Sequence, residues 1–211
     1  MNPVIIFGFN GVAKAAMEIF QSHNIEVYGF LTDDKEKHGT EVGEITVLGN
    51  PKDDGFLKLI GKKCEAFVAT DSNEERREQV KMLNERRKVQ PTNAVHSEAY
   101  ISKSAHLCHG NFVNAGAFLG AETEIKSHCL VHSRAVLDHG VKVDDYVQIG
   151  AGSVLNSEVE VAEGAFIGSG VTVVSGVKIG KNARVGAGSV VISNVEDGET
   201  VFGNPAVAVK K

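Results

Sequence analysis

Cysteine is scarce in this chain of 211 residues, and the few cysteines form no recognisable pattern. Cys64, Cys108 and Cys129 are an odd set without the close paired spacing of a metal site or a disulfide framework. We therefore predict three reduced structural thiols. Such usage is typical of a protein of the reducing cytoplasm.

Several other signals are also missing from the sequence. No charged segment followed by a short apolar run opens the chain, as in a secretory leader, and no apolar run is long enough to span a bilayer. Acidic residues outnumber basic ones by 27 to 22, which gives a formal net charge of −5. This excess argues against nucleic acid as the main partner. We expect neither membrane insertion nor nucleic-acid binding.

An unbroken six-residue repeat occupies the C-terminal half. Every sixth residue is aliphatic at Val95, Ile101, Leu107, Val113, Leu119, Ile125, Val131, Leu137, Val143, Ile149, Leu155, Val161, Ile167, Val173, Ile179, Val185 and Val191. A repeat of this length does not arise by chance. A second small or branched residue follows four positions later, as at Ala117, Val141 and Ser153.

The period of six determines the fold class of this half. An amphipathic helix repeats its apolar face at about 3.6 residues and a half-buried strand at 2, so both are excluded. One short strand and one corner fit into six residues, and three such units close a triangular coil. Glycine often follows the aliphatic residue directly, and we expect it to turn the corners at Gly120, Gly150, Gly168, Gly180 and Gly186. The sequence predicts an all-β parallel β-helix with a central aliphatic column.

The first ninety residues alternate apolar runs with helical patterns, which predicts an α/β unit with a small parallel sheet. The predicted strands cover residues 4–7, 26–31, 45–50 and 65–70, and the predicted helices cover 14–21, 53–61 and 73–88. We interpret the many charges of the last helix as a solvated face. Residues 90–93 break the pattern, so we place the two domains at 1–90 and 91–211.

A glycine-bearing turn joins the first predicted strand to its helix. Gly8, Asn10 and Gly11 lie in a strand–turn–helix arrangement that can present backbone N–H groups to a phosphate. The spacing is shorter than the dinucleotide fingerprint, and a plain tight turn is the alternative. Asp33 and Asp34 end the second strand, where carboxylates accept hydrogen bonds from a ribose or base. A solvated loop is the alternative there.

Histidines concentrate on neighbouring coils of the predicted β-helix, at His106, His109, His128, His132 and His139. A corner side chain points outward, and His139 has little local cover. Imidazole is the natural general base near neutral pH, so His139 is the candidate catalyst, with a plain surface histidine as the alternative. A shared zinc site, as in β-helix carbonic anhydrases, is a rival interpretation. His96 and His132, two coils apart at about 10 Å, are too distant to bind one metal.

These motifs, together with the ending Gly203-Asn204-Pro205-Ala206, resemble the bacterial nucleotide-sugar acetyltransferases of the hexapeptide-repeat class, whose relatives include sialic-acid O-acetyltransferases. The resemblance implies a Rossmann-like front unit that binds the nucleotide sugar, a left-handed β-helix and a homotrimer. It implies direct transfer of acetyl from acetyl-CoA to the amino group of a UDP- or GDP-linked amino sugar, without a metal. O-acetylation of a sialic-acid-like sugar, acyl transfer to an amino acid and a non-catalytic or metal-binding scaffold are the alternatives.

The resemblance also implies roles for single residues. His139 corresponds to the base that deprotonates the sugar amine. The acidic residue that follows this base in the family is Gly140 here, so the acidic neighbour is Asp138, whose side chain we expect to point in another direction.

The remaining roles concern the two substrates. On the sugar-nucleotide side, the family's phosphate loop corresponds to Gly8, Asn10 and Gly11. The family's acidic pair near the nucleotide base corresponds to Asp33 and Asp34, and an asparagine of the family corresponds to His132. Gln148 takes the place of a second histidine that can donate a hydrogen bond to the thioester oxygen. The groove for acetyl-CoA between subunits would include Ser157, Gly168, Ser169 and Ala187.

Overall fold

The computed structural model describes residues 2–209, which form two compact units that divide between Ser97 and Glu98. The sequence-based boundary between residues 90 and 91 falls slightly earlier in the chain. The difference arises because the first pair of the six-residue repeat, Ala94–Val95, is grouped with the front unit.

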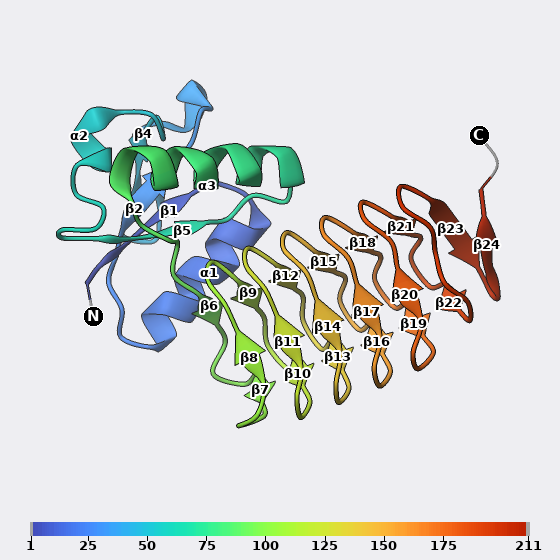
Figure 1. Ribbon diagram of the computed structural model, residues 1–211. Coiled ribbons are helices and arrows are strands. Elements are labelled where there is room, and N and C mark those ends of the chain that lie inside the picture. Colours follow the sequence, from blue (N-terminus) through green and yellow to red (C-terminus); the bar gives the residue numbers. More distant parts are fainter. Residues whose placement is uncertain (1, 210–211) are drawn as a thin grey trace. The chain divides into compact units, whose positions relative to one another are not determined.

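The front unit is the predicted α/β unit, built on a sheet of five strands in the order β3-β4-β2-β1-β5 (Figure 1). Its elements are β1 (Val4–Phe7), α1 (Gly11–Ser22), β2 (Val27–Leu31), the 3-10 turn η1 (Lys35–Lys37), β3 (Glu41–Val42), β4 (Ile45–Gly49), α2 (Asp54–Leu57), β5 (Glu65–Val68), α3 (Asn73–Arg87) and β6 (Ala94–Val95). Strands β4, β2, β1 and β5 are parallel, and β3 pairs antiparallel with β4. All four residues of β1 are buried, so the sheet has an apolar centre.

Two predictions for the front unit are wrong. The helix expected over residues 53–61 ends at Leu57, and turns follow it up to Gly61, which has a φ of 76°. The charges of α3 are not all solvated, because Arg76 is fully buried. Its Nη1 donates to the carbonyl oxygen of Thr70 at 2.6 Å and its Nη2 donates to Oδ1 of Asn73. A guanidinium can be buried when its N–H groups are hydrogen-bonded in this way.

In the second unit, the strands from β7 to β19 are short and parallel, and each is paired with the strand eighteen residues later, as Val136 is with Val154. The strands are β7 (Tyr100–Ile101), β8 (His106–Leu107), β9 (Phe112–Val113), β10 (Phe118–Leu119), β11 (Glu124–Ile125), β12 (Leu130–Val131), β13 (Val136–Leu137), β14 (Lys142–Val143), β15 (Gln148–Ile149), β16 (Val154–Leu155), β17 (Glu160–Val161), β18 (Phe166–Ile167), β19 (Thr172–Val173), β20 (Lys178–Ile179), β21 (Arg184–Val185) and β22 (Val190–Val191). Successive strands join three different sheets in turn, so the predicted stack of three-sided coils is present (Figure 1).

Each sheet forms one face of this unit. The β13 face has the order β22-β19-β16-β13-β10-β7, and the β14 face has the order β20-β17-β14-β11-β8. Within this unit, the β15 face contains β21, β18, β15, β12 and β9, together with β23 (Thr200–Gly203) and β24 (Ala206–Ala208).

The predicted aliphatic column forms the core of the coils. Every repeat position from Val113 to Val191 is at most 2% exposed, whereas Ile101 and Leu107 in the first coil are half-buried. Some inward positions are polar, and their side chains bond to the carbonyl of a corner in the next coil. Thr123 Oγ1 donates to the oxygen of Asp138 at 3.1 Å, and Ser153 Oγ donates to that of Gly168 at 2.8 Å.

The glycines that follow the aliphatic residues do not turn the corners as predicted. The left-handed corner residue lies three positions after the aliphatic residue and is often not glycine, as at Arg134 and Tyr146. The predicted glycines instead allow the next coil to approach closely: a Cβ on Gly150 would lie 2.4 Å from the backbone nitrogen of Ser169. The physical reason is therefore backbone contact between coils rather than backbone conformation.

The repeat changes at its C-terminal end. Val201 of β23 pairs with Val185, only sixteen residues earlier, and β24 then folds back antiparallel to β23. Asn204 and Pro205, the middle of the Gly203–Ala206 motif, form the turn between them. Among the described residues, no helix is both long and apolar enough to cross a membrane. None of the three cysteines forms a disulfide within residues 2–209, and of the three, Cys108 alone is exposed.

Candidate active site

His139 lies at the corner between the β13 face and the β14 face, directly after β13. Its side chain is 63% exposed and that of Asp138 is 46% exposed. The expectation that Asp138 points elsewhere is wrong: its Oδ1 accepts the backbone N–H of His139 at 2.8 Å and lies 3.3 Å from His139 Nδ1. An acidic residue before the histidine can therefore orient the ring, because a corner folds its side chain back over the following residue.

This contact determines what each group can do. The backbone N–H of His139, together with its ring, holds the pKa of the Asp138 carboxyl below its usual value. An ionised carboxylate only accepts hydrogen bonds, so it favours a proton on Nδ1 of His139. The other ring nitrogen, Nε2, then has a free lone pair and can accept a proton from a substrate.

Three backbone-level contacts position this corner. Gly120 lies one coil below, where a Cβ would be 2.9 Å from the backbone nitrogen of His139. The buried hydroxyl of Thr123 holds the carbonyl of Asp138, and the N–H of Glu158 in the next coil donates to the carbonyl of His139 at 3.0 Å. Sequence reasoning did not find Thr123 and Glu158, because their roles depend on stacking between coils.

Ser157, predicted to contact acetyl-CoA, lies one coil above His139 at the same corner. Its hydroxyl donates to Oγ of Ser175, a further coil above, at 3.0 Å. The two hydroxyls extend the polar edge that starts at His139.

Gln148 and His132, predicted to serve the two different substrates, contact each other on the β15 face. Nε2 of Gln148 lies 3.1 Å from Nε2 of His132, and the His132 ring packs edge-on against Phe112. The amide nitrogen of Gln148 can only donate, so Nε2 of His132 accepts and its proton is on Nδ1.

The remaining residues predicted for acetyl-CoA lie at the corner between the β15 face and the β13 face. Gly168 and Ser169 follow β18, and Ala187 is one coil above, where a Cβ on Gly168 would lie 2.6 Å from its backbone nitrogen. The width of the β13 face separates this corner from the corner of His139 and Ser157. One chain alone does not bring the predicted catalytic and acetyl-CoA residues together.

The β13 face between these two corners is apolar. Its outward side chains are Tyr100, Phe118, Val136, Val154, Thr172 and Val190. Tyr100 and Phe118 stack with their ring centroids 4.9 Å apart, yet remain 57% and 38% exposed. The β14 face instead presents charged side chains, including the ion pair of Lys178 and Glu160 at 3.0 Å.

The predicted phosphate-loop residues line a cavity of about 300 Å³ in the front unit. Its walls are Gly8, Phe9, Asn10, Thr32, Asp33, Asp34, Thr70, Glu75 and Gln79, so four of the five predicted front-unit residues meet here. The fifth, Gly11, is the first residue of α1. Gly8 has a φ of 117°, and a Cβ there would lie 2.6 Å from the carbonyl oxygen of Ala69, so the position requires glycine.

Asn10 links the loop to the start of α1 and to the loop that follows β5. Its Oδ1 accepts from the backbone N–H of Ala13 at 2.9 Å as the helix N-cap, and its Nδ2 donates to Asp71 at 3.4 Å. The Nζ of Lys14 lies 5.2 Å from the ring centroid of Phe9 in the cavity wall. A cation and a helix N-terminus therefore accompany the glycine loop.

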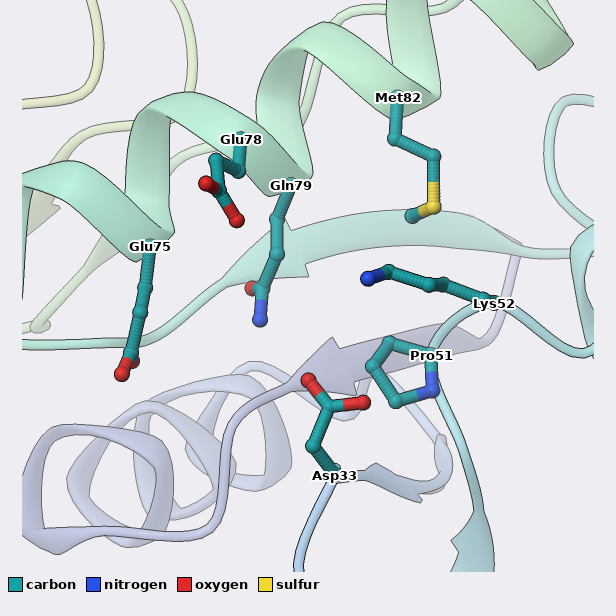
Figure 2. A pocket seen from close by; sticks show the side chains of 7 residues that line it. All are labelled: Asp33, Pro51, Lys52, Glu75, Glu78, Gln79 and Met82. Carbon is teal, nitrogen blue, oxygen red and sulfur yellow. The ribbon is translucent and has the colours of Figure 1, made fainter.

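A second, smaller cavity shares Asp33, Glu75 and Gln79 with the first (Figure 2). Its other walls are Pro51, Lys52, Glu78 and Met82. Asp33 is held in place by Asn50, whose Nδ2 donates to Oδ1 of Asp33 at 2.8 Å. Sequence reasoning identified Asp33 at the strand end but missed the α3 side chains. No pattern in the sequence shows which face of α3 points to this edge of the sheet.

The family model for the bacterial transferase hexapeptide (six repeats) matches residues 158–193. Comparison with curated protein sequences gives no match. Within residues 2–209, no group of three or more histidine, cysteine or acidic side chains is arranged to hold a metal ion.

Solved structures similar to this chain cover almost its full length. Perosamine N-acetyltransferase from Caulobacter crescentus, crystallised with CoA and GDP-perosamine, is 29% identical, with 100% of this chain and 98% of that chain covered and a TM-score of 0.91. The acetyltransferase domain of PglB from Neisseria gonorrhoeae, crystallised with acetyl coenzyme A, is 26% identical, with 99% of each chain covered and a TM-score of 0.90. WeeI from Acinetobacter baumannii shares the fold at 23% identity and a TM-score of 0.88, over 98% of this chain and 99% of that chain.

These findings define the class of the protein: it is an acyltransferase built on hexapeptide repeats. Within this class, the predicted resemblance to the bacterial nucleotide-sugar acetyltransferases is confirmed.

Proposed function

We propose that the protein transfers acetyl from acetyl-CoA to the amino group of a nucleotide-linked amino sugar. Two of the relatives support this reaction, one by its name and its complex with CoA and GDP-perosamine, the other by its complex with acetyl coenzyme A. Acetyl-CoA is the co-substrate of the protein.

The exposed pair of His139 and Asp138 is the observation that carries the proposed mechanism. With Asp138 favouring a proton on Nδ1, Nε2 of His139 accepts a proton from the sugar amine as its nitrogen attacks the thioester carbonyl. The carbon–sulfur bond then breaks, and the CoA thiolate leaves and takes up a proton. Two structures of the perosamine enzyme are of variants in which one histidine is replaced, which is consistent with a histidine of functional interest.

The front unit supplies a place for the sugar nucleotide. A diphosphate at the Gly8–Asn10 loop would face the N-terminus of α1, a helix of 12 residues whose dipole favours negative charge. Lys14 lies one turn into this helix, beside Phe9 of the loop, and adds a positive charge. The carboxylates of Asp33 and Asp34 line the other side of the same cavity and can accept hydrogen bonds from hydroxyl or N–H groups.

We also propose a homotrimer, as the resemblance implies, and the positions of the predicted residues around the β13 face support it. His139 and Ser157 lie at one edge of this face, and Gly168, Ser169 and Ala187 lie at the other. If the β13 face contacts a neighbouring subunit, the edge of one chain meets the opposite edge of the next, and the two groups join in one groove. Its exposed Tyr100 and Phe118 supply the apolar area that such contact buries.

The same relatives support the finer description of the fold as a left-handed coil preceded by a Rossmann-like unit. We also assign the protein to the cytoplasm. The three cysteines, none of which forms a disulfide within residues 2–209, agree with a reducing compartment.

The direct test is CoA release from acetyl-CoA in the presence of UDP- and GDP-linked amino sugars, a sialic-acid-like sugar and serine. We expect release with an amino-sugar nucleotide only, and mass spectrometry of the product should place the acetyl group on nitrogen. Release with the sialic-acid-like sugar or serine alone would support those alternatives. No release with any acceptor, with zinc in the purified protein, would support the scaffold.

A further inference from the structure

We infer that the cavity of Figure 2 selects guanine over uracil as the base of the sugar nucleotide, through the carboxylate of Asp33. The inference rests on the proposed function, because it requires a sugar nucleotide to bind the front unit. It goes further in assigning the base and the residue that reads it.

The two cavities of the front unit form one continuous site for a nucleoside diphosphate. They share Asp33, Glu75 and Gln79. The larger one, called the outer cavity, contains the Gly8–Asn10 loop and borders the start of α1. A diphosphate needs the N–H groups and positive charge of that helix terminus. The nucleotide base is therefore left for the smaller cavity of Pro51, Lys52 and Met82, called the inner cavity below, which lies beyond the shared residues.

The inner cavity suits a flat ring with hydrogen-bond donors on its edge. Figure 2 shows the buried ring of Pro51 and the thioether of Met82 on opposite sides of it, and both surfaces are apolar. The lining contains three carboxylates, those of Asp33, Glu75 and Glu78, against the single ammonium group of Lys52. Ionised carboxylates only accept hydrogen bonds, so most of the charged groups that line this cavity bind N–H or O–H donors of a ligand.

Guanine and uracil present opposite edges to such a wall. Guanine has a ring N–H beside an exocyclic NH₂, which together can bond both oxygens of one carboxylate, while its O6 and N7 accept from a lysine. Uracil has one ring N–H between two carbonyl oxygens, so it can give a carboxylate only one hydrogen bond, and its carbonyl oxygens then lie near the carboxylate oxygens. Lys52, which extends into the cavity in Figure 2, completes the match to guanine.

Asp33 is the residue best prepared to read the base. Asn50 holds it by donating from Nδ2 at 2.8 Å, and Oδ1 of Asn50 in turn accepts the backbone N–H of Lys52 at 2.8 Å. Glu75 is held in a similar way, because its Oε2 accepts the hydroxyl of Thr70 at 2.8 Å, but only Asp33 is linked through Asn50 to Lys52 of the same cavity. A carboxylate whose orientation is fixed in advance loses little freedom on binding.

Gln79 gives a second, independent indication that a donor is missing. Its side chain lines both cavities, and its Oε1 is buried without a hydrogen-bond partner among residues 2–209. A buried acceptor without a partner is unfavourable. A base that brings N–H groups supplies the donor after the amide turns towards it. Guanine keeps an N–H for this purpose after bonding both oxygens of Asp33, whereas uracil has a single ring N–H.

Isothermal titration calorimetry of the full-length protein with GDP, IDP and UDP tests the inference without any acetyl transfer. IDP is the matched probe, because it differs from GDP only by the missing 2-amino group. We expect GDP to bind about 10- to 100-fold more tightly than UDP, and IDP to fall between them. In Asp33→Asn, the dissociation constant of GDP should rise until it lies within about threefold of the constant of IDP for the same variant. The dissociation constant of UDP should change little.

Glu74→Gln is the matched control, since Glu74 is an exposed acid on the same helix that lines neither cavity. It should preserve all three affinities, and the thermal midpoint of each variant checks that it is folded. UDP binding as tightly as GDP would overturn the inference and leave the proposed function standing. An equal loss of all three ligands in Asp33→Asn would also overturn it, because Asp33 would then contact the ribose. No binding of any of the three would contradict the proposed function itself.

Discussion

Gly120 lies one coil below the peptide bond that joins Asp138 to His139, and a Cβ atom at this glycine would come within 2.9 Å of the backbone nitrogen of His139. The space between the two coils therefore has room for the hydrogen atom of a glycine but not for a Cβ atom. The position of the candidate base depends on the lack of a side chain one coil away.

Gly120→Ala should therefore lower both stability and turnover. The added methyl group must displace the His139 corner, which costs about 1–3 kcal/mol of the free energy of unfolding. A displacement of the base should reduce kcat at least tenfold. Gly180→Ala is the matched control, because its Cβ would meet the backbone nitrogen of Asp197 at 2.5 Å, away from His139. Thermal melts and steady-state kinetics should show loss of stability in both variants and loss of kcat only in Gly120→Ala.

His139→Ala should remove most turnover, by about 10²–10⁴-fold, if His139 is the general base. The substitution removes an exposed side chain, so the thermal midpoint should change little. His106→Ala, which truncates another exposed histidine of the same unit, should retain full activity. Activity within a few-fold of the parent in His139→Ala would count against this residue as the base.

Asp138→Asn should reduce kcat by about tenfold, because an amide is a weaker acceptor for the Nδ1 proton. The pKa of Asp138 is lowered in the folded protein, chiefly by the backbone N–H of His139. The stabilisation from this carboxylate is thus fully present above its unfolded pKa and is lost as the pH falls through the lower folded pKa. Turnover of the parent should show no titration of Asp138 near neutral pH. A pH–rate profile from pH 5 to 9 would contradict this if Asp138→Asn removed a limb of the curve.

Asp33→Ala should raise the KM for the sugar nucleotide and leave the KM for acetyl-CoA unchanged. The carboxylate lies in the front-unit cavities, and the residues predicted for acetyl-CoA lie on the coils. Initial rates at varied concentrations of each substrate separate the two constants. An equal rise in both would reject the front unit as the sugar-nucleotide site.

Val154→Glu should break the proposed trimer, because it places a charge in the middle of the apolar β13 face. Lys142→Glu, which changes charge on the β14 face, is the control and should leave the assembly intact. Sedimentation or light scattering gives the mass, and CoA release should fall together with the trimer. A parent protein with the mass of one subunit would refute the shared active site.

The sequence predicted the coils well because their strongest constraint repeats in one dimension. Each strand places one aliphatic residue in the column, and this requirement leaves a period that can be counted. The left-handed corner residue has no such signature, since glutamate, histidine, arginine, tyrosine and asparagine all occupy it. What the corner needs there is a backbone conformation, which glycine shares with several polar residues.

The candidate sites were predicted only in part for a related reason. Gly8 and Asp33 could be found because each lies at the end of a strand, where position along the chain determines position in space. Gln79 and Met82 approach Asp33 from a helix that is distant in sequence, and the rotation of α3 decides which side chains face the sheet. Arg76 was misjudged because its partner is a backbone carbonyl, and residue type does not show a carbonyl that needs a donor.

The antiparallel β24 has a consequence for how molecules meet end to end. A stack of similar coils can in principle be extended indefinitely. The unpaired edge of its last parallel strand can hydrogen-bond to the first coil of another molecule. On the β15 face, the reversal of β24 presents neighbours with donors and acceptors in the wrong sequence for a parallel partner. On this face, the antiparallel strand therefore disfavours the addition of another molecule's coil to the last one, which would be the first step towards a filament.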